Sequence, residues 1–249
     1  MVISRESHHE IGYLALQGCS NITVRNLWLD GGSISGPSTG IILKNTTNST
    51  LIHNHLTHLW AGIYLHNSYG NLVADNYLAD GTHGIVITAE QANTITNSTI
   101  QNNEVGVSLL GSAQVIYRNN LINNTQQVHS TDWHEYNYKP VPNGVHVWDS
   151  GGQGNYWSDY AATDSNHDGI ADKPHTISQV RINIDHYPLI APVEIPGFIE
   201  PSPPPTQTPN NLPSALSDWI LPVVVVAVIG VCTVLILYVI KHKGNRVNL

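Results

Sequence analysis

Residues 84–109, GIVITAEQANTITNSTIQNNEVGVSL, contain one complete repeat of about 22 residues and the beginning of the next. Each repeat opens on a glycine followed by apolar residues, and these glycines are Gly40, Gly62, Gly84 and Gly106. A fixed period of this length is typical of a solenoid, in which each winding buries its apolar face by stacking on its neighbours. Gly12 precedes Gly40 by one period plus a short insertion, which the turn-rich residues 31–39 can supply.

Three further positions recur in each repeat, namely an apolar or β-branched residue, a polar residue three places later and a second apolar residue two places after that. The first position holds Thr23, Leu51, Val73, Ile95 and Tyr117. The second holds Asn26, Asn54, Asn76, Ser98 and Asn120, and the third holds Trp28, Leu56, Leu78, Ile100 and Ile122. Because asparagine tolerates the left-handed backbone region, the second position predicts a bend between two short strands, with stacked Asn side chains bonded along the axis.

The repeats contain short β-branched or apolar runs and no stretch of helical periodicity. We therefore predict an all-β fold, a right-handed single-stranded parallel β-helix of 22-residue coils over residues 1–129. Stacked strands lie about 4.8 Å apart, so the coils predict a rod of roughly 25 Å. Residue 1 falls inside a coil, and we expect the rod to be N-terminally incomplete.

The remainder of the chain differs in composition. Residues 130–193 are rich in Trp and Tyr, which would cap the open end of the rod or form a sugar-stacking surface. Residues 194–218 are rich in proline and predict an extended stalk. Ile220–Ile240 is an uncharged run long enough for one transmembrane α-helix, placed at 219–240, and the basic tail 241–249 predicts a cytoplasmic C-terminus. The chain would be a single-pass membrane protein with its repeats outside.

Charge and cysteine content limit the possible partners. Before the apolar run the chain has 7 Lys and Arg against 18 Asp and Glu, a net charge of −11, which disfavours binding to nucleic acid. Cys19 lies in the repeats and Cys232 in the apolar run, so no internal disulfide is expected. The Asn-x-Ser/Thr pattern predicts five glycosylation acceptors: Asn21, Asn45, Asn48, Asn97 and Asn123.

An Asp-rich loop matches most of a calcium-binding loop. Asp164, Asn166 and Asp168 occupy positions 1, 3 and 5, followed by a glycine at position 6 and the carbonyl of Ile170 at position 7. Asp172 follows at position 9, whereas position 12 holds a histidine instead of the usual glutamate. The loop predicts a structural calcium site, and a metal-free loop of Asx turns is the alternative.

The C-terminal motifs resemble those of surface proteins with NosD-type β-helix domains. These motifs are GNYWSDY at 154–160, DGIAD at 168–172 and DHYPL at 185–189, and the run 117–128 is similar to the last coil of that family. The resemblance covers residues 1–193 and implies a right-handed parallel β-helix shared with carbohydrate-binding and sugar-hydrolysing proteins. The family takes its name from a periplasmic copper-handling protein, although the domain also occurs in proteins with no known copper role.

Copper ligation requires histidines that converge. Five of the 14 histidines fall within two adjacent coils: His53, His55, His58, His66 and His83. The 22-residue register places His53 beside Asp75, His58 beside Asp80, and His66 between Lys44 and Thr88, so that no histidine lies over another. Copper binding is not expected on this basis.

Catalysis on sugars requires two neighbouring carboxyl groups. The register places no two acidic residues of the rod together, so we predict a binding or structural role at the cell surface, towards glycans or envelope components. A truncated or degenerate polysaccharide-active enzyme is the first alternative, and copper handling is the second.

Overall fold

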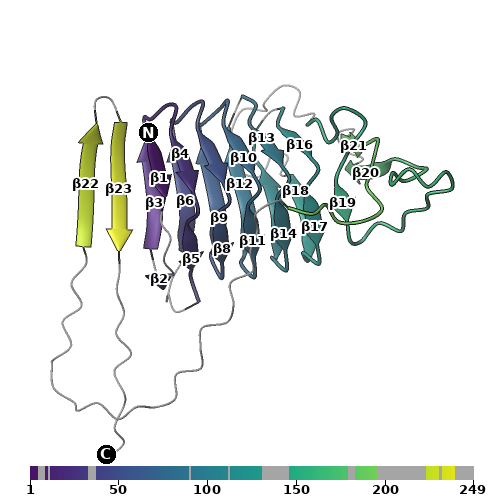
Figure 1. Ribbon diagram of the computed structural model, residues 1–249, viewed down its shortest axis with the longest axis horizontal. Helices are drawn as coiled ribbons and strands as arrows, with labels where there is room; N and C mark the ends of the chain where they lie inside the picture. Colours follow the sequence, from purple (N-terminus) through teal and green to yellow (C-terminus); the bar gives the residue numbers. More distant parts are fainter. Residues whose placement is uncertain are drawn as a thin grey trace, which may run out of the picture.

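The computed structural model describes residues 1–4, 9–10, 12–32, 38–89, 91–111, 113–130, 146–178, 183–195, 223–229 and 232–238. Side chains are described for these residues except 4, 9, 10, 12, 178 and 223–238. The chain winds into a rod in which three sheets run along the axis, and a smaller C-terminal region covers one end (Figure 1). This arrangement confirms the all-β parallel solenoid predicted from the repeat.

Each winding contributes one strand to each sheet, and neighbouring windings pair in parallel. The first sheet consists of β1 (Val2–Ser4), β4 (Thr23–Arg25), β7 (Thr50–Ile52), β10 (Leu72–Ala74), β13 (Thr94–Thr96) and β16 (Val115–Tyr117). The second consists of β2 (His9–Glu10), β5 (Trp28–Asp30), β8 (His55–Thr57), β11 (Tyr77–Ala79), β14 (Thr99–Gln101), β17 (Asn120–Ile122) and β19 (Tyr156–Trp157). The third contains β3 (Gly12–Gln17), β6 (Thr39–Lys44), β9 (Ala61–His66), β12 (His83–Thr88), β15 (Val105–Leu109) and β18 (Gln126–Ser130).

Apolar residues at matching positions form the core of the rod. Leu51, Val73 and Ile95 stack in register in the first sheet and are fully buried, as the repeat predicted. Towards the two ends of the rod the prediction is off by one residue, because the winding from β4 to β7 contains 27 residues and the winding from β13 to β16 contains 21. Val24 and Ile116 therefore face the core in place of Thr23 and Tyr117. For the same reason the residue opposite Gly40 is Tyr13 rather than Gly12.

The repeated glycines allow close stacking of windings. A Cβ atom on Gly62 would lie 2.8 Å from the carbonyl oxygen of Gly84 and 2.9 Å from Leu78 Cδ2. None of the repeated glycines has a positive φ, so the reason for glycine is the approach of the next winding and not a tight bend.

Asn26 lies at a bend as predicted, with a φ of 55°, but in the later windings the bends fall one or two residues before the predicted positions. His53, Asp75, Asn97 and Arg118 adopt left-handed φ angles between 49° and 56° at the corner between the first and second sheets. The following residues, Asn54, Asn76, Ser98 and Asn119, point inwards and are buried. The side chain of each inward residue accepts a hydrogen bond from the backbone N–H of the corresponding residue one winding earlier, as in Asn54 N to Asn76 Oδ1 at 2.9 Å. Asn119 replaces the predicted Asn120 because the last winding is shorter, and at the other end Leu27 rather than Asn26 donates to Asn54.

This asparagine ladder continues into the C-terminal region. Asn119 N donates to Asn155 Oδ1, and Asn155 N donates to the carboxylate of Asp185 at 2.7 Å. Trp148 and Trp157 are buried against the last winding, and Tyr156 pairs with Asn120 in the second sheet. The small sheet of β20 (His175–Ser178) and β21 (Asn183–Asp185) brings Asp185 to this point. Backbone and side-chain hydrogen bonds together therefore attach the aromatic region to the end of the rod.

The described part of the apolar C-terminal run consists of two strands. β22 (Val223–Ile229) and β23 (Cys232–Tyr238) form an antiparallel hairpin, and β23 pairs with β3 at the other end of the rod (Figure 1). The helix predicted over 219–240 is therefore not confirmed, and none of the described residues forms a helix able to cross a membrane. The run is rich in β-branched residues, which favour strands, and the edge of β3 offers unpaired backbone groups.

The expectation that the chain has no disulfide was wrong. Cys19 is buried in the first winding and is disulfide-bonded.

Candidate functional site

Aromatic and histidine side chains gather on the outer face of the third sheet. Alternate residues of β9 and β12 point outwards there, because Ile63, Leu65, Ile85 and Ile87 point into the core. We call the group of Trp60, Tyr64, His66, His83 and Ser108 the histidine–aromatic cluster. Strand pairing brings its members together from three windings, since Tyr64 is aligned with Val86 and Ser108, and His66 with Thr88.

Rings in the cluster meet mainly edge to face. The Trp60 ring centroid lies 5.3 Å from that of His83 and 6.3 Å from that of Tyr64, with interplanar angles of 72° and 80°. The Nδ1 atom of His66 lies 2.9 Å from Thr88 Oγ1 and 3.4 Å from the Tyr64 hydroxyl. Trp60 remains 37% exposed. The arrangement presents an indole to solvent, bordered by imidazole and hydroxyl groups that can donate or accept hydrogen bonds.

Burial lowers the pKa of His83, an effect that the negative charge of Glu104 partly opposes. This imidazole is therefore neutral at pH 7, the form that accepts a hydrogen bond or binds a metal. Ser108 Oγ lies 3.5 Å from His83 Nδ1 and the Ser108 side chain is buried. An activated serine needs its base within about 2.6–3.2 Å. The contact gives no support to Ser108 as a nucleophile.

The structure separates the histidines that the sequence singled out. His53 and His58 occupy corners at the two ends of β8, where His53 lies 3.8 Å from Asp75 as predicted. His58 pairs with Asp30 of the preceding winding at 2.8 Å, and not with Asp80. His55 is stacked between Trp28 and Tyr77 on the second sheet. Within the described ranges, no three His, Cys, Asp or Glu side chains are grouped so that they could hold a metal ion.

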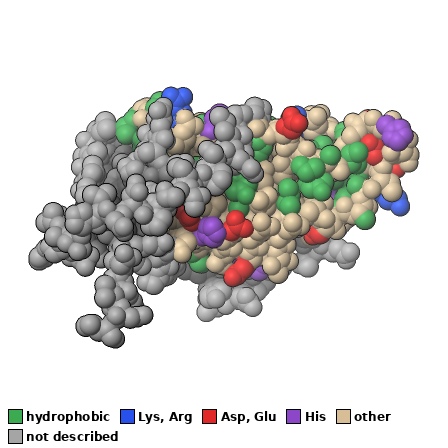
Figure 2. All heavy atoms as spheres, turned by 60° about the horizontal axis from the view of Figure 1, so that its bottom comes forward, with side chains coloured by type: hydrophobic (Ala, Val, Ile, Leu, Met, Phe, Trp, Pro, Cys, Tyr) green, Lys and Arg blue, Asp and Glu red, His purple; other side chains and the backbone are tan. Residues whose placement is uncertain are grey.

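Acidic side chains are also dispersed. Several aspartates of the described residues pair with a histidine, as in His186–Asp149 at 2.9 Å. In the face shown in Figure 2, the acidic and histidine side chains are scattered along the rod and do not form one acidic patch.

The Asp-rich loop is held together by its own hydrogen bonds. Asp164 accepts bonds from the N–H groups of Asp168 and Gly169, at 3.2 and 3.0 Å, and Asp168 accepts one from Ile170 at 2.9 Å. Hydrogen bonds from Ser165 lower the pKa of Asp172. Asn166 donates its side-chain amide to Asp168. The contact between Asp168 and Ile170 is an Asx turn, and calcium binding by Asp164, Asn166, Asp168, Ile170 and Asp172 stays a prediction.

The calcium hypothesis predicts that a chelator lowers the melting temperature of the full chain. A ligand present at about 100 times its Kd stabilises a protein by about 2.7 kcal/mol, so its removal gives a measurable shift in differential scanning calorimetry. Asp168→Ala should abolish the sensitivity to chelator. If the chelator leaves the melting temperature of the unmodified chain unchanged, the loop is metal-free.

The five glycosylation acceptors share one structural position. Asn21, Asn45, Asn48, Asn97 and Asn123 all lie at left-handed corners, and the residue after each of them is buried. Asn97 is half-buried and its Oδ1 atom accepts a hydrogen bond from Arg118 Nε at 2.9 Å. The winding itself therefore explains the spacing, with a corner asparagine, an inward residue and then a threonine at or beside the next strand. Glycosylation stays a prediction.

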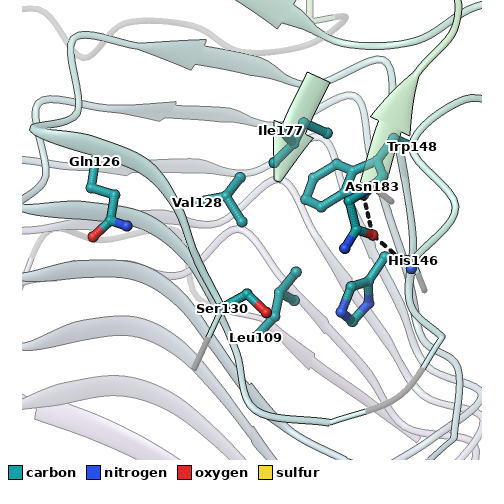
Figure 3. Close-up of a pocket in the computed structure, with 8 residues that line it drawn as sticks. All are labelled: Leu109, Gln126, Val128, Ser130, His146, Trp148, Ile177 and Asn183. Atoms are coloured by element: carbon teal, nitrogen blue, oxygen red, sulfur yellow. Dashed lines mark hydrogen bonds between the residues drawn. The ribbon is translucent and has the colours of Figure 1, made fainter. Parts of the chain in front are cut away.

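A small cavity lies between the last windings and the aromatic region. Leu109, Val128 and Ile177 line it together with Trp148 (Figure 3). Asn183 Oδ1 accepts hydrogen bonds from Trp148 Nε1 at 3.0 Å and from the backbone N–H of His146 at 2.9 Å (Figure 3). The cavity volume is about 140 Å³. Small-molecule pockets usually measure about 300–1,000 Å³, so this cavity is too small for an oligosaccharide.

The histidine–aromatic cluster was missed at the sequence level. Its signal lies in the outward positions of the repeat, where Tyr64 follows the repeated glycine by two residues and Trp60 precedes it by two. Comparing outward positions from one winding to the next would have brought Trp60, Tyr64 and His83 together.

The sequence pattern of the family described as "Periplasmic copper-binding protein (NosD)" matches residues 6–162. The chain belongs to the NosD family. The match extends from the first winding to β19, and so includes nearly the whole rod and the histidine–aromatic cluster. It agrees with the stacked parallel windings seen in the structure.

A curated relative from Stutzerimonas stutzeri is named "Probable ABC transporter binding protein NosD". It is 34% identical over 82 residues, which make up 32% of this chain and 16% of the relative. The chain thus spans only about a sixth of the length of this NosD relative. The periplasmic description of the family is consistent with repeats that lie outside the cytoplasm.

Proposed function

We propose that this NosD-family chain is an envelope protein that binds a polysaccharide on the outer face of the third sheet. The observation that carries the proposal is the exposed indole of Trp60 within the histidine–aromatic cluster. Its neighbours His83 and Tyr64 fix the ring by edge-to-face contacts. A rigid indole with polar groups at its border can stack on a sugar ring and bond its hydroxyl groups, at little entropic cost on binding.

The shape of the site supports a polymer over a small molecule. The cluster lies on the outer face of a sheet that continues along several windings, and the cavity beside the aromatic region is too small for an oligosaccharide. The net negative charge before the apolar run favours a neutral polysaccharide over an acidic one.

Trp60→Ala is expected to weaken binding of neutral oligosaccharides to the full chain by at least tenfold, because the stacking surface is removed. Binding would be measured by isothermal titration calorimetry with oligomers selected on a glycan array. Tyr69→Ala is the matched control, since Tyr69 is similarly exposed but lies at a corner away from the cluster. Equal affinities of the Trp60→Ala variant and the unmodified chain would refute the proposed site.

Copper handling is the second candidate, and the family description favours it. On the described residues it would depend on the imidazoles of His66 and His83, which the register sets at opposite ends of β9 and β12, so that each would bind copper separately. Titration of the full chain with Cu(I) and Cu(II) tests this candidate. Copper binding that is lost in His66→Ala and His83→Ala variants, but kept in His53→Ala, would support copper over polysaccharide.

We further propose that the apolar run attaches the chain to a membrane. Ile220–Ile240 contains no charged residue, and Lys241, Lys243 and Arg246 follow it directly. About 20 apolar residues cross a bilayer as a helix, and flanking basic residues stay on the cytoplasmic side. The sequence supports this proposal, and the strands β22 and β23, together with the disulfide of Cys19, are the competing arrangement of the same residues.

The anchor predicts that the full chain sediments with membranes and resists alkaline carbonate extraction. Removal of residues 220–240 should release it to the soluble fraction. If the full chain is released by carbonate, the run does not span the bilayer.

A further inference from the structure

The outer face of the second sheet carries a column of stacked rings. Trp28, His55 and Tyr77 occupy equivalent positions in successive windings. The rings of Trp28 and His55 are 3.7 Å apart with an interplanar angle of 11°, and those of His55 and Tyr77 are 4.6 Å apart at 18°. Thr99 and Asn120 continue the same column towards the aromatic end of the rod.

At the end of the C-terminal region, the backbone of Val193 contacts this column at Asn120. Asn120 forms two hydrogen bonds with the backbone of Val193, donating to its carbonyl at 2.9 Å and accepting from its N–H at 2.7 Å. Four residues earlier, Leu189 forms a bridge with Tyr156, which pairs with Asn120 from the end of the rod. The chain thus moves one winding back along the rod between Leu189 and Val193, in the direction of Tyr77, His55 and Trp28.

The residues that follow Val193 have the length and composition to continue along the column. One winding is about 4.8 Å, so Tyr77 lies about 10 Å and Trp28 about 19 Å beyond Asn120. A proline-containing extended chain advances about 3.1 Å per residue, so about three residues reach Tyr77 and about six reach Trp28. From Val193 these positions are Pro196 and Ile199, with Phe198 between them.

The chemistry of the column suits an apolar chain segment better than a sugar. His55 is stacked between Trp28 and Tyr77, so a sugar ring has no indole face to stack on between them. Proline-rich segments bind aromatic surfaces in an extended form that loses little entropy. Beside the column, the outward-facing Thr57 and Ala79 are only 7% and 3% exposed, which a segment lying along this face would explain.

We propose that residues 194–201 of the same chain bind along the column of Trp28, His55 and Tyr77. The stalk then leaves the rod at the end opposite the aromatic region, and the second sheet is closed to other partners. This inference concerns a different sheet from the proposed polysaccharide site and does not depend on it.

Photo-crosslinking of the full chain tests the inference. Phe198→p-benzoylphenylalanine should, on irradiation, form adducts with peptides that contain Trp28, His55 or Tyr77. Mixing with ¹⁵N-labelled chain shows by mass spectrometry whether both peptides come from one molecule. Thr206→p-benzoylphenylalanine is the control, because position 206 lies beyond the reach of the column and should give no such adducts.

A second variant tests the entry point. Asn120→Ala removes both hydrogen bonds to Val193 and should reduce the adduct yield from position 198 at least fivefold, while circular dichroism shows that the rod stays folded. Adducts distributed over the first and third sheets, adducts mainly with the labelled partner, or a yield unaffected by Asn120→Ala would each overturn the inference.

Discussion

Gly84→Val is expected to prevent formation of the rod. A Cβ atom on Gly84 would lie 2.6 Å from the carbonyl oxygen of Gly106 and 2.5 Å from Ile100 Cγ2. The isoleucine can turn aside, but the carbonyl belongs to the backbone of the next winding and cannot move without separating the sheets. Overpacking of this kind usually costs about 1–3 kcal/mol even for one methyl group. We expect Gly84→Ala to lose about 3 kcal/mol of stability and the valine variant to lack a cooperative unfolding transition.

Gly152→Ala provides the control. Gly152 has a φ of 77° and no atom lies within 4 Å of the place where its Cβ would stand, so its substitution strains the backbone without a collision. That strain costs about 1 kcal/mol. Denaturant unfolding followed by circular dichroism compares the variants. Equal stabilities of Gly84→Ala and Gly152→Ala would show that the windings do not approach as closely as described.

Asp185→Ala is expected to detach the aromatic region from the rod. The carboxylate is fully buried and accepts hydrogen bonds from Asn155 N at 2.7 Å and Trp157 Nε1 at 2.9 Å. Removing it leaves buried donors without a partner, each at a cost of about 1–3 kcal/mol. We expect a loss of about 3 kcal/mol or more, together with loss of the near-ultraviolet signal of Trp148 and Trp157.

Asp185→Asn separates the contribution of the hydrogen bonds to stability from that of the charge. Burial raises the pKa of Asp185, so the folded protein holds this proton more tightly than the unfolded chain does. The stability from this group is present below the unfolded pKa and is lost as pH rises through the folded pKa. The asparagine variant keeps an acceptor oxygen and should be more stable than Asp185→Ala, with a flatter dependence on pH. A melting temperature of Asp185→Ala equal to that of the unmodified chain would contradict this role.

The rod could be predicted from the sequence because the same spacing recurs in many windings. Leu51, Val73 and Ile95 recur at the same spacing, and one misjudged residue does not alter the period. The register at the two ends of the rod was predicted less accurately, because a strictly constant period placed Thr23, Tyr117 and Asn120 one residue out of register. In the windings after Asn26, the bend was misplaced for a different reason. Asparagine suits both the left-handed corner and the buried ladder, and only the structure shows which adjacent residue has which role.

The candidate site was harder to predict than the fold. Histidines that are close in sequence, such as His53, His55 and His58, lie on different sides of β8, whereas Trp60 and His83 come together only through strand pairing. The motif DHYPL was recognised by resemblance, and the structure supplies its physical reason. Asp185 ends the asparagine ladder, and a Cβ on Gly154 would overlap its carboxylate, which explains why glycine begins the motif GNYWSDY.

The distance between two residues in one column of the first sheet tests the stacking of windings most directly. Arg25 and Tyr117 are far apart in sequence but occupy the same column, four windings from each other. Nitroxide labels attached through p-acetylphenylalanine at these positions should give a mean separation of about 19 Å in pulsed electron–electron double resonance, since each winding adds about 4.8 Å. Replacing the Tyr117 label by one at Thr96 should shorten the separation by one winding. A separation twice as large as expected, or one that does not shorten with the move to Thr96, would contradict the stacked rod.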